Sequence, residues 1–292
     1  MNKGLTITLI IFLSVLTVSL TAGLTVLLKS DFKFENINFD DNLSTNLVEE
    51  KEISDIKDLD INTDLADIII EGKDIENIKV ELYSNNVEDY EITDEDVVKI
   101  VLKEKKYGFL KLGRKTPNVK VYLPKSYSNN IKTNTNAGDT GIKGIKDASI
   151  NIKTDAGDLK VDEIVKANIT SRVGDVRIKK VNELVVDSNV GDIRIGEVDN
   201  IIYKSKTGDV KIETVSNSLD INSKTGDVKI ESINLKKNSI IKSNTGDIKI
   251  KNITGCYVEG KSNVGDVNIN NNDRKSDIVL KIKNNIGDID VN

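Results

Sequence analysis

The sequence contains no histidine and no tryptophan, and it has one cysteine and two prolines among 292 residues. Histidine is the commonest side chain for proton transfer near neutral pH and for binding transition metals, so its absence argues against both kinds of site. Cys256 has no second thiol for a disulfide or a metal cluster, and no histidine to activate it as a nucleophile. We expect Cys256 to be a small buried hydrophobic residue at the start of a strand. These absences predict a non-enzymatic protein with no catalytic residue, cofactor or metal site.

The composition favours β-structure. Apolar residues make up 38% of the chain and aromatic residues only 4%, and isoleucine, valine and leucine dominate the apolar share. β-Branched side chains fit a pleated surface, so strands are the expected element. Two prolines are too few for a proline-rich stalk.

The beginning of the chain predicts a membrane anchor. From Leu5 to Leu28 it carries only apolar residues, glycine, serine and threonine, with Lys3 before this segment and Lys29 after it. Roughly 20 such residues cross a bilayer as a helix. The alternative is a cleaved signal peptide, whose apolar region is usually only about 7 to 15 residues long and ends at an A-x-A site. Because that site is missing, we favour an uncleaved transmembrane helix over residues 5–28, and the lack of a cysteine near its end argues against a lipoprotein.

The charges around this segment predict its orientation. Lys3 and the α-amino group precede it, whereas residues 31–100 hold 22 acidic and 6 basic side chains. The positive flank of a membrane helix stays in the cytoplasm. We therefore expect a single-pass protein of the cell membrane, with a cytoplasmic tail at 1–4, an acidic linker at 29–52 and an extracytoplasmic domain at 53–292.

A Gly-Asp dipeptide recurs along the second half of the chain at intervals of 17 to 22 residues. Its copies are Gly138-Asp139, Gly157-Asp158, Gly174-Asp175, Gly191-Asp192, Gly208-Asp209, Gly226-Asp227, Gly246-Asp247, Gly265-Asp266 and Gly287-Asp288. When each glycine is numbered zero, position +4 is always isoleucine or valine, and position +2 is aliphatic except at Thr140. Position −3 is serine or threonine except at Asn284. Stacked structural repeats produce such columns.

The spacing of these columns predicts the shape of each repeat. Positions −7, −5, −3 and −1 alternate as in a strand with one buried face, but the next aliphatic positions are +2, +4 and +7. The alternation therefore breaks three times in each repeat, and each break indicates a corner. We predict an all-β fold, a three-sided single-chain β-helix with coils of about 17–20 residues, right-handed because the coil length varies. Inserts such as residues 234–238 are expected to be loops at one corner.

A further coil lies upstream. The segment LDINTDLADIII at 59–70 reproduces the columns around Ala66-Asp67, so the solenoid is expected to begin near Ile53. The inserted residues 71–130 contain strand-like runs that we expect to pair as a small antiparallel sheet covering the first coil, because an uncovered end invites edge pairing. These runs are Ile78–Tyr83, Val97–Leu102, Phe109–Leu112 and Val119–Leu123.

Each Gly-Asp pair is interpreted as a structural corner. Glycine adopts a positive φ at low cost, and an aspartate side chain can bond to nearby backbone N–H groups. Stacked aspartates bind calcium in the nonapeptide coils of RTX proteins, but the G-G-x-G-x-D signature of those coils is absent. Cations at position +3 would offset the repulsion within the aspartate column without a metal. We expect the serine and threonine column to form a hydroxyl ladder inside the coil, because no base is available to activate a nucleophile.

The repeats resemble those of a bacterial family of candidate adhesins of unknown function, which is described by coils of the form S/T-x-x-G-D followed by alternating hydrophobic residues. The resemblance covers about Ile53 to Asn292 and rests on LDINTDLADIII, on VYLP at 121–124 and on TGDVKI at Thr207 and Thr225. It implies a solenoid in the bacterial envelope, sometimes behind a transmembrane helix, and some relatives look linked to envelope-stress systems. It implies no catalytic or ligand-binding residues. Ala66 departs from the pattern by replacing the first glycine.

Three functions stay open at this point. The first is a membrane-anchored, adhesin-like interaction scaffold. The second is a sensor or accessory subunit of an envelope-stress signalling system, in which a signal would have to pass through a membrane partner because only about four residues precede the helix. The third is a polysaccharide-active β-helix enzyme, and the even spacing of the charged residues argues against it because no cluster of unlike groups interrupts the columns.

The charge balance suggests a partner. Residues 101–292 hold 34 basic and 25 acidic side chains. A basic stripe beside the Gly-Asp corners, made of Arg177, Arg194, Lys211 and Lys229, would suit an anionic cell-wall polymer. The alternative is that these side chains only keep the strands soluble and discourage edge pairing. We expect the partner to be an anionic wall polymer or an envelope membrane protein, and not a nucleic acid.

Overall fold

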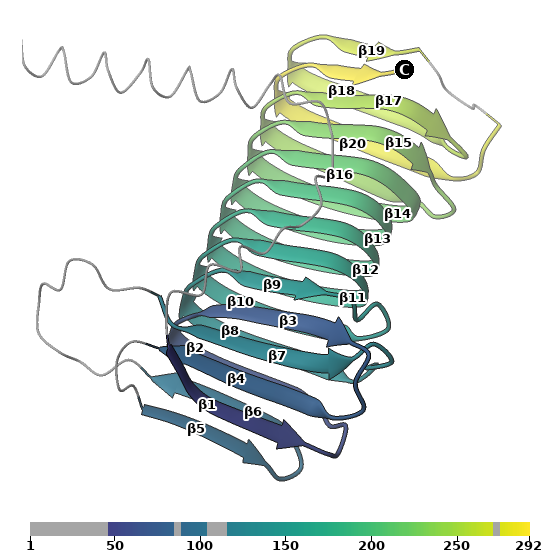
Figure 1. The fold of residues 1–292 in the computed structure, drawn as a ribbon. Coiled ribbons are helices and arrows are strands. Elements are labelled where there is room, and N and C mark those ends of the chain that lie inside the picture. Colours follow the sequence, from purple (N-terminus) through teal and green to yellow (C-terminus); the bar gives the residue numbers. More distant parts are fainter. Residues whose placement is uncertain (1–45, 85–88, 104–115, 271–274) are drawn as a thin grey trace, which may run out of the picture. The chain divides into compact units, whose positions relative to one another are not determined.

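The structure is a computed structural model that describes residues 46–84, 89–103, 116–270 and 275–292, all within one compact unit, Asn38–Asn292. The described residues form an all-β solenoid, in which 21 strands join one sheet (Figure 1). The cytoplasmic tail and the transmembrane helix predicted for residues 1–28 lie outside the described residues. Within the part of the chain that is described, no helix has the length and apolar character needed to cross a membrane.

The strands follow one another with short connections. The first seven are β1 (Asn46–Ile53), β2 (Leu59–Leu65), β3 (Asp67–Lys73), β4 (Ile78–Ser84), β5 (Asp89–Asp94), β6 (Val98–Lys103) and β7 (Asn118–Pro124). The next seven are β8 (Asn130–Ala137), β9 (Thr140–Lys143), β10 (Ser149–Ala156), β11 (Leu159–Val173), β12 (Val176–Val190), β13 (Ile193–Thr207) and β14 (Val210–Thr225). The last seven are β15 (Val228–Asn234), β16 (Ser239–Thr245), β17 (Ile248–Thr254), β18 (Tyr257–Val264), β19 (Val267–Ile269), β20 (Val279–Ile286) and β21 (Ile289–Val291).

The coils stack in parallel and in the register that the Gly-Asp repeat predicts. Between β11 and β12, for example, Val161 lies opposite Ile178 and Ser171 lies opposite Ser188. The pairing of these strands is interrupted at Asp162, at Val165 and around the Gly174 corner. These three interruptions agree with the three breaks of alternation in the sequence.

The core consists of the inward columns. Residues at −7, −5, +2, +4 and +7 are buried in the middle coils and are aliphatic except for Tyr203, and the solenoid interior is continuous from one coil to the next. Cys256 is also buried, directly before β18, as predicted. The prediction was wrong for position −1, where Val173 and Val190 are 49% and 46% exposed. The reason is that the corner begins before the glycine: pairing skips position −2, and both −2 and −1 then face outward.

The serine and threonine column at −3 is buried, but it is not a continuous hydroxyl ladder. Thr63 Oγ1 donates a hydrogen bond to Thr135 Oγ1 at 3.0 Å. The hydroxyl groups of Thr154, Ser171, Ser188, Ser205, Ser223 and Ser243 have no hydrogen-bond partner within the described chain. Neighbouring strands are about 4.8 Å apart, whereas hydroxyl oxygens bond at about 2.8 Å. The strand spacing therefore disfavours direct bonds between successive hydroxyl groups.

The N-terminal end contains one coil more than predicted. β6 pairs with β2 and β7 pairs with β3, both in parallel, so these strands extend the stack instead of only covering it. The antiparallel pairing that we expected occurs between β1 and β4, between β4 and β7, and between β5 and β6. The predicted linker at 29–52 extends too far, because β1 already begins at Asn46. The run Phe109–Leu112 lies outside the described residues.

At the other end, the order of the coils in space differs from their order in the sequence. β20 pairs with β16 on one side and with β18 on the other, and β21 lies in the same way between β17 and β19. The last coil of the chain is thus inserted beneath the preceding one (Figure 1). The terminal coil differs from the inner coils at position −5, where Gly260 stands in place of a large side chain such as Ile282. A Cβ atom on Gly260 would lie 2.8 Å from Ile269 Cδ1, so Ile269 fills that space in the terminal coil.

Candidate functional site

The Gly-Asp corners are the most regular feature of the molecule. The nine glycines of the repeat have φ between +129° and +142°, a conformation that other residues rarely adopt. A Cβ atom on Gly174 would also lie 2.0 Å from the carbonyl oxygen of Gly157 in the neighbouring coil. The glycine is therefore needed for its backbone conformation and for the close contact between successive corners.

The aspartates link one coil to the next. Asp158 Oδ1 accepts a hydrogen bond from the backbone N–H of Asp175 at 2.9 Å, and Asp175 Oδ1 accepts one from the N–H of Asp192 at 3.0 Å. The same bond recurs at every junction from Asp67 to the terminal coil, with lengths between 2.8 and 3.0 Å. Turn chemistry predicts a bond to a nearby backbone N–H within the corner, whereas the structure places the donor in the next coil.

The predicted basic stripe lies against this aspartate column. Arg177 reaches Asp175 at 2.9 Å and Asp158 at 3.4 Å. Arg194 lies 3.8 Å from Asp192, and Lys229 lies 3.0 Å from Asp227. Lys211, the fourth predicted contact, has no ion pair among the described residues. Three of the four cations are thus engaged by the corners, which reduces their availability for an anionic ligand.

Burial affects the charge of the column. It raises the pKa of the Asp209 carboxyl, and the neighbouring aspartates raise it further, while the N–H of Asp227 and the Lys229 ammonium lower it. The net pKa lies above the usual range. Among the described residues, the aspartates do not gather with other ligating side chains into a group of three that could hold a metal ion. That no metal binds stays a prediction.

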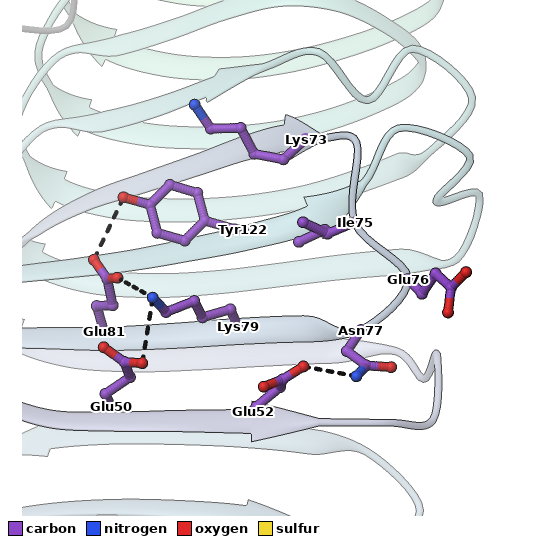
Figure 2. A pocket seen from close by; sticks show the side chains of 9 residues that line it. All are labelled: Glu50, Glu52, Lys73, Ile75, Glu76, Asn77, Lys79, Glu81 and Tyr122. Atoms are coloured by element: carbon purple, nitrogen blue, oxygen red, sulfur yellow. Dashed lines mark hydrogen bonds and ion pairs between the residues drawn. The ribbon is translucent and has the colours of Figure 1, made fainter.

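A second polar site lies near the N-terminal end of the solenoid, where β1, β4 and β7 are paired (Figure 2). We call it the Glu81 hollow; it has a volume of about 640 Å³. It is lined by Glu50, Glu52, Lys73, Ile75, Glu76, Asn77, Lys79, Glu81 and Tyr122.

Hydrogen bonds hold Glu81 at the base of this hollow. The side chain is buried and accepts bonds from Tyr83 Oη at 2.7 Å and from Tyr122 Oη at 3.4 Å. Lys79 Nζ lies 2.8 Å from Glu81 and 3.3 Å from Glu50. Figure 2 shows Lys79 between these two carboxylates. Each charged group of this network therefore has an oppositely charged partner.

These contacts set the protonation states. Burial raises the pKa of Glu81, but the hydrogen bonds from Lys79, Tyr83 and Tyr122 outweigh it, so this pKa lies below its usual range. Burial and Glu81 raise the pKa of Tyr83 to about 12 and that of Tyr122 to about 12. The hydrogen bond to Glu81 raises the pKa of Lys79. At neutral pH the carboxylate is a weak base and the phenols stay protonated, so the hollow suits ion pairing better than proton transfer.

Sequence reasoning missed the Glu81 hollow. The signal was present, because Lys79, Glu81 and Tyr83 alternate along one strand and therefore share a face. Their partners Glu50 and Tyr122 come from strands that are distant in the sequence. The antiparallel pairing of β4 with β1 and β7 brings them together.

The comparisons with known proteins agree with the repeat pattern. The model of the Toastrack DUF4097 family matches residues 56–199 and 179–292. No curated protein sequence is significantly similar to the chain.

Three solved structures cover most of the chain. A candidate cell adhesion protein from Clostridium sporogenes is 15% identical, with 83% of this chain and 98% of the other covered and a TM-score of 0.23. A candidate adhesin from Bacteroides fragilis is 16% identical, with 86% and 99% covered and a TM-score of 0.42. A candidate lipid-binding protein from Parabacteroides distasonis is 16% identical, with 84% and 96% covered and a TM-score of 0.42.

Proposed function

The chain belongs to the Toastrack DUF4097 family, and from this premise we propose that it is a non-enzymatic, membrane-anchored envelope protein whose β-solenoid serves as an adhesin-like interaction scaffold. The observation that carries the proposal is the repetition of the outer surface. Asn168, Val185 and Ile202 lie opposite one another on successive coils, and the outward positions beside them are in the same register. The side chains of such a column differ, but their spacing repeats about every 4.8 Å, so a repetitive partner meets weak contacts at a fixed distance, and such contacts add through multivalency.

The chemistry of the corners and of the Glu81 hollow supports a non-enzymatic role. The corner aspartates bond to backbone N–H groups, and Glu81 is bonded to Lys79, Tyr83 and Tyr122. A hydrolase would instead need an acid and a base with separated pKa values facing an accessible substrate. These polar groups stabilise the fold, and their arrangement gives no reason to assign a reaction.

The membrane anchor is part of the proposal and rests on the sequence between Leu5 and Leu28 with Lys3 before it. The N-terminus is then cytoplasmic and the solenoid is extracytoplasmic. The full chain is expected to stay with membranes after an alkaline wash, and protease added to intact protoplasts should degrade the solenoid. A solenoid released in soluble form would instead indicate a cleaved signal peptide.

The scaffold role is tested with the full chain in phosphatidylcholine nanodiscs and purified cell-envelope fragments. We expect the protein to sediment with the fragments without releasing soluble reducing sugar ends. The matched control is the double variant Lys79→Met, Glu81→Gln, which removes both partners of this partly exposed ion pair and should sediment like the wild type. Failure of the wild type to sediment would contradict a scaffold. Reducing ends that the wild type releases and the double variant does not would assign an enzymatic reaction to the hollow.

A further inference from the structure

The outer face of the C-terminal coils carries a concentration of lysines. They project from β13, β14, β16, β20 and β18, which are adjacent in this order in the stack. We call this set the lysine face, and it consists of Lys204, Lys206, Lys224, Lys242, Lys261, Lys281 and Lys283. All of these side chains are exposed.

Three of these lysines lie directly beside one another. Lys242 of β16 is in register with Lys283 of β20, and Lys283 is in register with Lys261 of β18. None of the three has an ion pair within the described part of the chain. On the wider lysine face, Glu259 lies 3.9 Å from Lys281, and Asp187 is in register with Lys204.

Cations also stack in register at position +3, but there Arg177 and Lys229 are paired with corner aspartates. Lys166 faces Glu183 at 3.0 Å on the neighbouring coil, and Lys180 faces Glu197 at 3.0 Å. In-register like charges on adjacent strands are destabilising, and neighbouring strands are only about 4.8 Å apart. The column formed by Lys242, Lys283 and Lys261 therefore carries repulsion that a bound anion would relieve.

The flanking columns indicate the shape of that anion. On the corner side, position −2 carries asparagine in β16, β20 and β18, where Asn263 Nδ2 donates to Asn285 Oδ1 at 2.8 Å, and it carries Lys206 and Lys224 in β13 and β14. On the other side, position −6 carries Ile202, Asp220, Ile240, Lys281 and Glu259 along the stack. Apart from Lys281, which lies near Glu259, the lysines thus form a strip that runs along the stack, at position −4 in β16, β20 and β18 and at position −2 in β14. An extended membrane surface would also meet Asp220 and Glu259, whereas a single polymer chain would avoid them.

We infer that the lysine face binds a linear phosphodiester polyanion, which lies along the coil stack across β14, β16, β20 and β18. The lysine ammonium groups contact its phosphates, and their flexible stems adjust to its charge spacing. This inference deepens the proposed scaffold function and rests on it. It also moves the expected contact away from the corner stripe, where Arg177, Arg194 and Lys229 are already paired with aspartates.

The test measures binding of end-labelled poly(glycerol phosphate) to the full chain in phosphatidylcholine nanodiscs. The triple variant Lys242→Gln, Lys261→Gln, Lys283→Gln is compared with Lys146→Gln, Lys236→Gln, Lys237→Gln. The second triple removes the same charge from exposed corner loops without ion pairs among the described residues. We expect the first triple to bind at least about tenfold more weakly and the second to bind like the wild type. The slope of log affinity against log salt should fall by about 0.7 for each lysine removed from the face.

Two results would overturn the inference. Equal weakening by both triples would show that net charge alone attracts the polymer. Vesicles containing phosphatidylglycerol carry the same phosphate chemistry on a surface, and binding to them through the three lysines without binding to the polymer would assign a membrane contact instead. The scaffold function is tested separately. If the first triple variant sediments with envelope fragments as well as the wild type does, the scaffold function is retained and only the role of the lysine face is contradicted.

Discussion

The carbonyl oxygen of Gly191 occupies the place that a side chain on Gly208 would need, since a Cβ atom there would lie 2.0 Å from this oxygen. Gly208 also has a φ of +142°. The backbone N–H of Gly208 donates a hydrogen bond to the carbonyl oxygen of Thr225 in the next coil at 3.0 Å. The Gly208 corner therefore contacts the preceding coil through the Gly191 carbonyl and the following coil through this bond. Corner conformation and coil spacing therefore depend on the same residue.

Gly208→Ala should destabilise the solenoid by more than the roughly 1–3 kcal/mol of a strained backbone conformation, because the new methyl group also displaces the neighbouring corner. Chemical denaturation of the full chain measures this loss. Thr207→Ala is the control: the side chain is exposed and adjacent, and its removal should change the free energy of unfolding by about 0.5 kcal/mol or less. Equal stability of the two variants would contradict the contact.

The Asp209 side chain is expected to matter as a hydrogen-bond acceptor rather than as a charge. Asp209→Ala loses the bond from the Asp227 N–H, which is 2.9 Å long, and should cost about 1–3 kcal/mol. Asp209→Asn keeps an acceptor oxygen and should be at least as stable as the wild type at pH 7. A pKa raised on folding contributes stability that is present at acid pH and lost as the pH rises through the folded value. Any advantage of the asparagine should therefore disappear below about pH 4, which urea denaturation at both pH values can test.

Chelation should leave the melting temperature of the protein unchanged. At each corner before the terminal coil one aspartate oxygen accepts a bond from the next coil, and in several coils the other faces an arginine or lysine, as at Arg177 and Lys229. Thermal denaturation with EDTA, and then with added calcium, measures the effect. A fall of several degrees with EDTA that calcium restores would establish the calcium alternative.

The threonines of the −3 column offer a matched pair of variants. Thr135 accepts a bond from Thr63 and donates one to the Ala137 carbonyl at 3.2 Å, whereas the Thr154 hydroxyl has no partner in the described chain. Valine has nearly the same shape without the hydroxyl. Thr135→Val should cost about 1–3 kcal/mol because it leaves the buried Thr63 hydroxyl without an acceptor. Thr154→Val should be neutral or stabilising, and a similar loss in both variants, measured by chemical denaturation, would contradict this difference.

The repeat columns could be predicted from the sequence because a solenoid repeats the same environment in every coil. The glycine corner and the inward positions +2 and +4 follow from nine aligned copies, and position +7 follows from seven. Position −1 could not be predicted in this way. Val173 and Val190 fit the pattern of a buried column, but the bend before the glycine turns both side chains outward.

Strand direction and coil order depend on contacts that a hydrophobic pattern does not contain. The alternation in β6 and β7 is compatible with antiparallel or parallel neighbours, so the additional coil they form was not predicted. The basic stripe lies beside the corners, but the sequence does not show that Arg177 is engaged by two aspartates. The lysine column depends on the inserted coil, which places Lys283 between Lys242 and Lys261.

The inserted C-terminal coil gives the last prediction. Leu280, Ile282, Ile289 and Val291 are buried between the coil of β16 and β17 and the coil of β18 and β19. Deleting residues 276–292 removes the strands with which β18 and β19 pair, and Gly260 has no side chain to fill the space that Ile282 fills. In hydrogen exchange, the amides of β18 and β19 should therefore lose protection, while those of β11 to β13 keep theirs because each coil depends mainly on its neighbours.

Gly260→Ile in the deleted chain should restore protection if it lets β18 replace β20 against β16. Full protection of β18 in the deletion variant without this substitution would show that the terminal coil pairs equally well in the vacated layer, and that Gly260 does not determine the coil order.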